Sequence, residues 1–367
     1  MGIFDIFRSQ SWTLERLTPP WAPLRSLYDD IAAHLDVTTG SLPATYSLPD
    51  RLVIDREGVV PWGDGSLDGV FSHHVDLGDE GKRARRLVRA VTAILRTSSQ
   101  KNLERLYALI VSENLLSMID GFLRQITHED YELTRFRALA RYLARRGGHR
   151  SAVKLGIAML GIATTSEDLP LLRTLGACDE FALYAAVALT NQAADQEETE
   201  RELFELAKRV HGWGRVHVVE RLANARDPAI CAWLLREGFR NRIMNEYLAC
   251  ICARGGAMAD ALARPDIDDA LLLSCAEVLQ ALVDGCEGPA EGLDDYEDAS
   301  RAVENYLTHV ATRAPSDWQH LATTRSLERY VQALPSTREL AERGWTPRLR
   351  EHCTEAASRF LACVTRA

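Results

Sequence analysis

Apolar residues recur three and four positions apart along most of the chain. This spacing places them on one face of an α-helix. Short glycine breaks separate the periodic stretches, and short connections make neighbouring helices antiparallel. From Asp79 onward the pattern therefore predicts a succession of helices of about 10 to 16 residues. Clear examples of the period are Leu87, Val91, Ile94 and Leu95, then Leu103, Leu106, Leu109 and Ile110.

The middle of the chain repeats this helical pattern. First helices of successive pairs are predicted to begin near Ser166, Thr199, Asp227 and Gly256. Their spacing is about 30 residues, which is typical of two-helix solenoids. Glycines separate the two helices of three pairs, at Gly176, Gly212 and Gly238. Each such pair buries its apolar stripe against the next pair. Further helices are predicted at 299–313, 317–334 and 348–364.

Residues 1–78 have a different pattern, with frequent proline and glycine. One helix is predicted at 23–35, and β-like runs occur at 52–54, 59–60 and 69–75, separated by turn signals. We therefore expect two domains. Residues 1–78 would form a small irregular α+β module, and residues 79–367 a mostly α, HEAT-like α-solenoid of antiparallel helix pairs.

The stretch from Asp168 to Leu282 resembles bacterial HEAT-repeat proteins. The resemblance implies a curved helical scaffold whose second helices line a concave binding face, and it brings no catalytic residues with it. The stretch lacks a regular ladder of Asp and Arg at fixed repeat positions. A generic α-solenoid is therefore the alternative.

Charge is distributed unevenly along the sequence. The net charge of -9 excludes a general polyanion binder. Residues 80–156, however, hold 16 Lys and Arg against seven Asp and Glu, an excess of nine positive charges. The remainder carries an excess of 18 negative charges. This asymmetry suggests a charged partner, and solvated helix surface is the simpler alternative.

Cysteine usage and hydropathy predict the compartment. The eight cysteines show no Cys-x-x-Cys spacing, which indicates reduced, mostly buried thiols rather than a disulfide framework. The first residues lack the pattern of a secretory signal, and no apolar run is long enough to cross a bilayer. We therefore expect a cytoplasmic protein without a membrane partner. The sequence leaves the oligomeric state open.

The densest block of polar and aromatic residues extends over residues 213–246. A helix at 214–224 would place His217, Glu220 and Arg221 on one side, with Asn241 and Asn245 one turn apart on the next second helix. His217 would serve as an acid, base or hydrogen-bonding group beside an arginine anion clamp. The alternative is a structural network between repeats. The candidate partner-binding set is Trp213, Arg215, His217, Glu220, Arg221, Trp233, Asn241, Asn245 and Glu246.

Two acidic segments are weaker candidates for a metal. Residues 64–76 contain Asp64, Asp68, His73, His74 and Asp76, which include metal-ligand types. On a strand the two histidines would point to opposite faces, so a turn with structural residues is the simpler interpretation. The segment 287–298 does not have the spacing of an EF-hand, and we expect a solvated loop there.

A basic stripe is predicted on one helix, where Arg137, Arg141 and Arg145 follow at steps of four. With the basic set Lys82, Arg83, Arg85, Arg86 and Arg89, it could contact phosphates. Some HEAT-like proteins bind DNA with a concave basic face. The nearby aromatic residues, Phe136 and Tyr142, fit the core stripe, so a solvated face or an acidic protein partner is favoured over nucleic acid.

The sequence contains neither a phosphate-binding glycine loop nor a nucleophile elbow. We therefore expect a non-catalytic scaffold, without a cofactor, that binds another protein through its concave face. One alternative is an enzyme or metal-dependent protein that uses residues 213–246 or 64–76. The other is nucleic-acid binding through the basic helices of residues 82–145.

Overall fold

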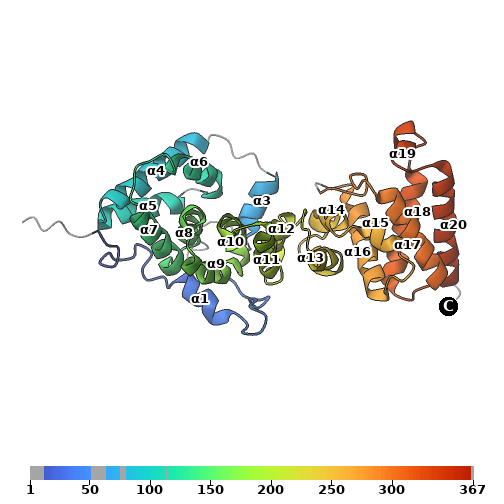
Figure 1. Ribbon diagram of the computed structural model, residues 1–367, viewed down its shortest axis with the longest axis horizontal. Coiled ribbons are helices and arrows are strands. Elements are labelled where there is room, and N and C mark those ends of the chain that lie inside the picture. Colours follow the sequence, from blue (N-terminus) through green and yellow to red (C-terminus); the bar gives the residue numbers. More distant parts are fainter. Residues whose placement is uncertain (1–11, 51–62, 75–79, 113, 289, 365–367) are drawn as a thin grey trace, which may run out of the picture. The chain divides into compact units, whose positions relative to one another are not determined.

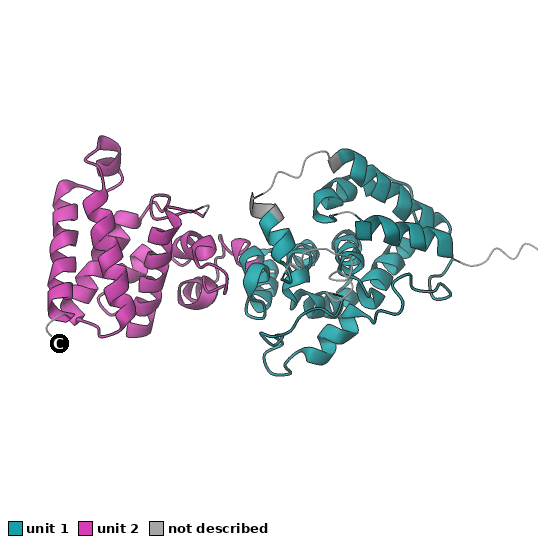
Figure 2. Cartoon of the chain, turned by 180° about the vertical axis from the view of Figure 1, so that it is seen from behind, with its two compact units in different colours: residues 1–217 teal, residues 218–367 magenta. Residues whose placement is uncertain are grey.

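The computed structural model describes residues 12–50, 63–74, 80–112, 114–288 and 290–364. Across these ranges every regular element is a helix and no strand is formed (Figure 1). The chain divides into two compact units, residues 1–217 and 218–367 (Figure 2). No helix in the described ranges combines the length and apolar character that a membrane span requires.

Unit 1 contains the longer series of helices. Its elements are α1 (Leu27–His34), α3 (Ser66–His74), α4 (Glu80–Arg96), α5 (Gln100–Ser112), α6 (Leu116–Ile126), α7 (Leu133–Arg146), α8 (Arg150–Ala163), the short 3-10 helix η2 (Ser166–Asp168), α9 (Leu169–Gly176), α10 (Asp179–Gln192) and α11 (Gln196–Ala207). Helix α12 (Gly212–Glu220) spans the boundary between the units.

Helix α8 is the centre of unit 1, since α5, α6, α7 and α10 all pack against it. Its middle is apolar on every side, which is typical of a buried helix. Gly156 allows the close approach of α7. A Cβ added there would lie 2.5 Å from the backbone nitrogen of Ala144 and 2.8 Å from the carbonyl oxygen of Ala140.

Unit 2 consists of shorter helices followed by long ones. Its elements are α13 (Pro228–Trp233), the π-helical turn η3 (Leu234–Gly238), α14 (Glu246–Gly255), α15 (Met258–Ala263), α16 (Asp269–Gly285), α17 (Ala299–Arg313), α18 (Trp318–Ala333), α19 (Arg338–Glu342) and α20 (Pro347–Val364). Within unit 2, α14, α16, α18 and α20 pack in succession, and α15 packs on α17. This arrangement is consistent with a helical repeat.

The predicted helix starts agree with the structure to within three residues. The elements η2, α11, α13 and α15 begin at Ser166, Gln196, Pro228 and Met258. The predicted helix 299–313 is α17, and the helix predicted at 23–35 is the shorter α1. The short helix α19 was not predicted, because its five residues are too few to show a period.

Arginines join helices that are separated by at least one other helix in the sequence of each unit. In unit 1, Arg141 pairs with Asp168 and Arg173 pairs with Glu202, 27 and 29 residues apart. In unit 2, Arg236 pairs with Asp268, 32 residues away. These pairs form the contacts of a repeat ladder, but their spacing and acid type vary. The sequence therefore shows no regular ladder.

The expected α+β module at the N-terminus is not supported. The predicted strand at 69–75 is wrong through residue 74, because the backbone there forms α3. The β-like runs at 52–54 and 59–60 lie outside the described residues. A Cβ at Gly69 would lie 2.2 Å from the Trp213 ring, so α3 docks closely on α12. β-Propensity is a weak signal that such packing overrides.

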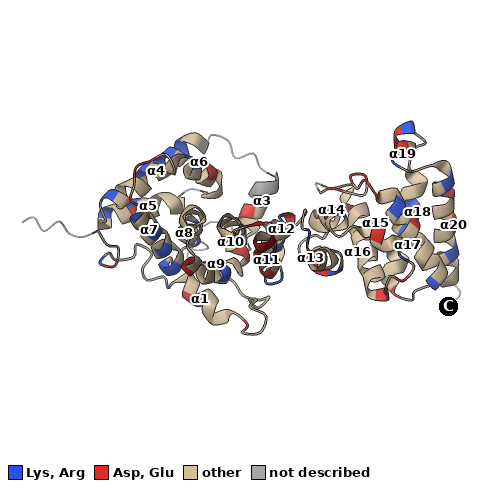
Figure 3. Cartoon of the chain, in the orientation of Figure 1, with Lys and Arg blue, Asp and Glu red and all other residues tan. Residues whose placement is uncertain are grey.

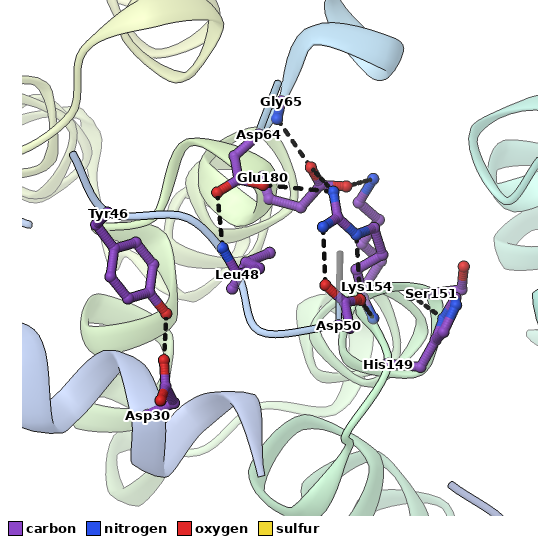
Figure 4. Close-up of polar contacts among 11 residues, drawn as sticks. Asp30, Tyr46, Leu48, Asp50, Asp64, Gly65, His149, Ser151, Lys154 and Glu180 are labelled. Atoms are coloured by element: carbon purple, nitrogen blue, oxygen red, sulfur yellow. Dashed lines mark hydrogen bonds and ion pairs between the residues drawn. The ribbon is translucent and has the colours of Figure 1, made fainter. Parts of the chain in front are cut away.

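A buried cluster of ion pairs anchors the N-terminal segment on unit 1 (Figure 4). The guanidinium of Arg150 pairs with Asp50 at 2.8 Å and with Glu180 at 2.8 Å. The ammonium of Lys154 pairs with Glu180 at 2.5 Å and with Asp68 at 2.7 Å. Lys154 and Glu180 are each only 4% exposed. Because both cations lie on α8, the cluster fixes Asp50 and Asp68 against that helix.

Burial and charge act in opposite directions on the carboxyl groups of this cluster. Burial raises the pKa of Asp64 above its ordinary value, despite the nearby Arg150. Burial also raises the pKa of Glu180, but the charges of Lys154 and Arg150 outweigh it and the pKa lies below its ordinary value. Glu180 therefore carries the negative charge that holds the two cations together.

Candidate anion-binding site

An open cavity of about 500 Å³ lies between α7 and the segment at residues 12–15. We call it the arginine cleft, because four of the residues that line it are arginines. The lining residues are Trp12, Thr13, Leu14, Glu15, Thr134, Arg137, Ala138, Arg141, Tyr142, Arg145 and Arg146. The structure thus places the predicted stripe of Arg137, Arg141 and Arg145 in one cavity and adds Arg146.

Helix periodicity explains how one wall of the cleft forms. Residues four apart on α7 lie on nearly the same face. The opposite face packs into the core through Phe136, Leu139 and Leu143, all of which are buried. The arginines are therefore the residues that the helix leaves facing outward.

Arg137 and Arg141 are held in place by the ends of the next helices. Arg137 Nε donates a hydrogen bond of 2.7 Å to the carbonyl oxygen of Ala163. Arg141 Nη2 donates to Asp168 Oδ2 at 3.1 Å and to Thr165 Oγ1 at 2.9 Å, and its Nε donates to the other carboxylate oxygen. Burial raises the pKa of Asp168, but the hydrogen bonds from Arg141 and Thr165 and the charge of Arg141 together outweigh that effect and the pKa is lowered. The charge of Arg141 is thereby compensated.

The other three arginines of the cleft have no carboxylate partner in the described part of the chain. Arg145 stacks on the Tyr28 ring, with its guanidinium carbon 4.8 Å from the centroid. Arg146 lies 5.9 Å from the Tyr142 ring, and Arg137 is bonded to a carbonyl. Both Arg145 and Arg146 are solvent-exposed and lie in the last turn of α7, where they also complement the helix dipole.

The second wall is fixed to the turn between α4 and α5. Trp12 Nε1 donates to the carbonyl oxygen of Ile94 at 2.9 Å, and the backbone nitrogen of Thr13 donates to Ser98 Oγ at 3.2 Å. The guanidinium of Arg135 lies over the Trp12 ring at 5.9 Å. The cleft therefore has two walls held by hydrogen bonds rather than a mobile flap.

Both aromatic residues of the cleft already make ring contacts within the protein. The guanidinium of Arg135 covers one face of the Trp12 ring, and the indole N–H of Trp12 is fixed by its hydrogen bond to the carbonyl oxygen of Ile94. Tyr142 is 7% exposed and packs against Trp21, with ring centroids 5.7 Å apart. Base stacking needs an open aromatic face. The site thus offers positive charge without a stacking platform.

Chemically, the cleft is suited to a carboxylate or phosphate group. Guanidinium groups donate two parallel hydrogen bonds to such anions, and a partly enclosed site strengthens them. Lys and Arg are concentrated on α4 and α7 (Figure 3). The basic set Lys82, Arg83, Arg85, Arg86 and Arg89 is solvent-exposed on α4 and does not line the cleft.

The candidate set at 213–246 is divided between the two units. In unit 1, Trp213, Arg215 and His217 are buried on α12, at 6%, 7% and 3% exposure. In unit 2, Glu220 ends α12 and is half-buried, and Arg221 follows in a turn. The predicted helix 214–224 thus ends four residues early. Trp233 is half-buried at the end of α13.

The expected placement of Asn241 and Asn245 on one helix is wrong. Asn241 lies in the loop before α14, and Asn245 is the N-cap residue of that helix, followed by Glu246 at its first position. Asn241 is fully buried and accepts hydrogen bonds from the backbone of Ile243 at 2.9 Å and Met244 at 3.0 Å. Its side chain therefore closes its own loop. The partner-binding role of the nine residues stays a prediction.

In the two acidic segments, 64–76 and 287–298, described carboxylates form ion pairs with arginine or lysine. Asp64 and Asp68 belong to the buried ion cluster, paired with Arg150 and Lys154. The side chains of His73 and His74 and all of Asp76 lie outside the described residues. In the loop 287–298, Arg254 binds Glu291 and Glu297. Within the described ranges no group of three or more His, Cys, Asp or Glu is arranged to hold a metal.

Comparison with protein-family models, curated proteins and solved structures gave no match. The fold thus defines the chain only as an all-helical protein consistent with a helical repeat. Sequence analysis missed Trp12, Thr13 and Glu15, because nothing local indicates that this segment returns to α7. Arg146 could have been predicted as a site residue from the sequence, because it follows Arg145 directly.

Proposed function

We propose that this chain is a HEAT-like helical-repeat protein that binds another protein, and that its arginine cleft takes an acidic segment of that partner. One observation carries the proposal: three arginines without a carboxylate partner in the described part of the chain line the same cavity. Uncompensated guanidinium groups that share a cleft are a common feature of sites for acidic motifs.

A protein partner is favoured over nucleic acid for two reasons. Tyr142 is buried and Arg135 covers one face of Trp12, so bases would find little open aromatic surface. The net charge of -9 and the carboxylates Glu15, Glu167 and Asp168 at or beside the cleft oppose a long phosphate backbone. A short acidic peptide segment avoids these groups more easily than a nucleic-acid strand does.

Fluorescence anisotropy with labelled probes tests the proposal. The probes are a 12-residue peptide rich in Glu, a Gln-rich peptide of equal length, and single-stranded oligothymidylate. We expect the wild type to bind the Glu-rich peptide and not the Gln-rich one. The charge-reversal variant Arg145→Glu/Arg146→Glu should bind it roughly tenfold to a hundredfold more weakly, because two charge-assisted hydrogen bonds are replaced by repulsion.

The matched control is Arg264→Glu/Arg338→Glu, which changes the charge equally at two exposed arginines of unit 2. It should leave the affinity unchanged. Equal binding of the Glu-rich peptide by wild type and the cleft variant would contradict the proposal. Tighter binding of oligothymidylate, abolished in the same cleft variant, would instead establish nucleic-acid binding.

A further inference from the structure

Three exposed apolar side chains lie on α7, which forms one wall of the arginine cleft, on α8, which packs against α7, and on α10, which packs against α8. We call Leu133, Ile162 and Val187 the apolar ledge; their exposed fractions are 49%, 36% and 37%. They are three of the seven large hydrophobic residues exposed in the described part of the chain. Single exposed hydrophobic residues are ordinary, but a group beside a charged cleft marks an interaction surface.

The packing of three helices brings the ledge together. Helix α8 lies between α7 and α10 (Figure 1). Because α7 and α8 are antiparallel, Leu133 at the start of α7 lies at the same end as Ile162 near the end of α8. On the α10 side, Asn191 Nδ2 donates to the carbonyl oxygen of Gly161 at 3.0 Å. A Cβ at Gly161 would lie 3.5 Å from Cα of Ala188, the residue after Val187.

The ledge also adjoins the cleft directly. Leu133 precedes Thr134, which lines the cleft, and it begins the same stripe of α7 that continues as Arg137, Arg141 and Arg145. The hydrogen bond from Arg137 to the carbonyl of Ala163 ties the cleft to the end of α8 beside Ile162. One face of α7 thus changes from apolar at its first residue to basic at its last turn.

We infer that the partner segment is an acidic peptide with an apolar end, the acidic residues lying in the arginine cleft and the apolar residues on the ledge. This inference rests on the proposed function and specifies its partner. From Leu133 to Arg145 the helix rises about 18 Å, which an extended peptide covers with about five or six residues. In the partner peptide, the apolar residues therefore lie about five or six positions away from the acidic residues.

Three labelled 12-residue peptides with the same four Glu residues test this inference. The first contains only Gly and Ser besides Glu. The second carries three Leu residues about five positions after the acidic block, and the third carries them about five positions before it. We expect one of the two Leu peptides to bind the wild type at least fivefold more tightly than the first peptide.

Two variants separate the ledge from general hydrophobic binding. Leu133→Ser/Ile162→Ser should abolish the gain and leave binding of the first peptide unchanged. Ile243→Ser/Met244→Ser replaces residues of comparable exposure in unit 2 and should keep the gain. Circular dichroism checks that both variants are folded.

The inference is overturned if neither Leu peptide gains affinity, or if the gain persists in Leu133→Ser/Ile162→Ser. Binding of the first peptide decides the proposed function separately. If that peptide binds and the Leu residues add no affinity, the ledge is not part of the binding site, while the proposed function of the cleft is retained. If no peptide binds, the proposed function itself fails.

Discussion

The contribution of a charged side chain to the stability of this protein depends on how deeply it is buried. Lys154 and Glu180 are buried and hold each other, whereas Lys208 and Glu205 form an exposed pair on α11 and the residues after it. An exposed ion pair is screened by water and contributes little. A buried pair costs desolvation, and removal of one partner leaves a charge without compensation.

At the residue scale we predict that Lys154→Met destabilises the protein by about 3 to 5 kcal/mol, because Glu180 and Asp68 lose their cation in the interior. Lys208→Met, the matched control, should change the free energy of unfolding by less than about 0.5 kcal/mol. Urea denaturation measures both. Similar effects of the two substitutions would contradict the assigned role of the cluster.

The cluster also predicts a dependence of stability on pH. The pKa of Glu180 is lowered in the folded protein, so its contribution is complete above its unfolded pKa near 4.5 and is lost as the pH falls through the folded pKa. Asp64 acts in the opposite direction, because its raised pKa favours the protonated form in the folded state. Urea denaturation from pH 6 to pH 3 should show a smaller loss of stability in Glu180→Gln than in wild type. An equal or steeper loss in the variant would argue against this assignment.

At the scale of elements, the contact of α7 and α8 depends on a glycine. Gly156→Ala should destabilise by about 1 to 3 kcal/mol, since the added Cβ would meet the α7 backbone at 2.5 Å. Gly161→Ala in the same helix has only ordinary contacts from 3.5 Å outward. It should be neutral or stabilising by up to about 1 kcal/mol. Thermal and urea unfolding compare the two variants, and equal effects would show that α7 and α8 pack less closely.

Other elements illustrate the limits of sequence patterns. Periodicity predicts α17 with both ends correct, because its apolar stripe and flanking breaks agree. It predicts a strand where α3 forms, because Val70 and Phe71 favour a strand locally, whereas in the folded chain this segment is a helix packed closely on Trp213. The helical period also wrongly places Asn241 on a helix. Its side chain accepts hydrogen bonds from the backbone of Ile243 and Met244, and this turn leaves no mark on the spacing of apolar residues.

Over the whole molecule, electrostatic interactions between distant charges are strong only at low salt concentration. The Debye length is about 10 Å at 0.1 M salt. At that ionic strength, carboxylates much farther than this from the cleft are largely screened, and the four arginines of the cleft outnumber the nearby Glu15, Glu167 and Asp168. The cleft can therefore attract an acidic partner although the net charge is -9.

We predict that affinity for the Glu-rich peptide falls between 0.1 M and 0.5 M NaCl by roughly tenfold or more. The additional affinity from Leu residues should persist, because apolar burial is not weakened by salt. Anisotropy titrations at several salt concentrations measure both quantities. Affinity for the Glu-rich peptide that does not change with salt would rule out the arginines as its main contacts.

The sequence by itself determined the helices after Asp79, most of their starts, the outward arginine stripe of α7 and the acidic loop at 287–298. These features depend on local periodicity, capping and turn residues, which act over a few positions. Only the tertiary structure decided that residues 12–15 close the arginine cleft and that Asp50 and Asp68 pair with Arg150 and Lys154. Those contacts connect segments about 80 to 130 residues apart. Their physical basis is hydrogen bonding of Trp12 and Thr13 in one case and the pairing of buried charges in the other, neither of which a local pattern encodes.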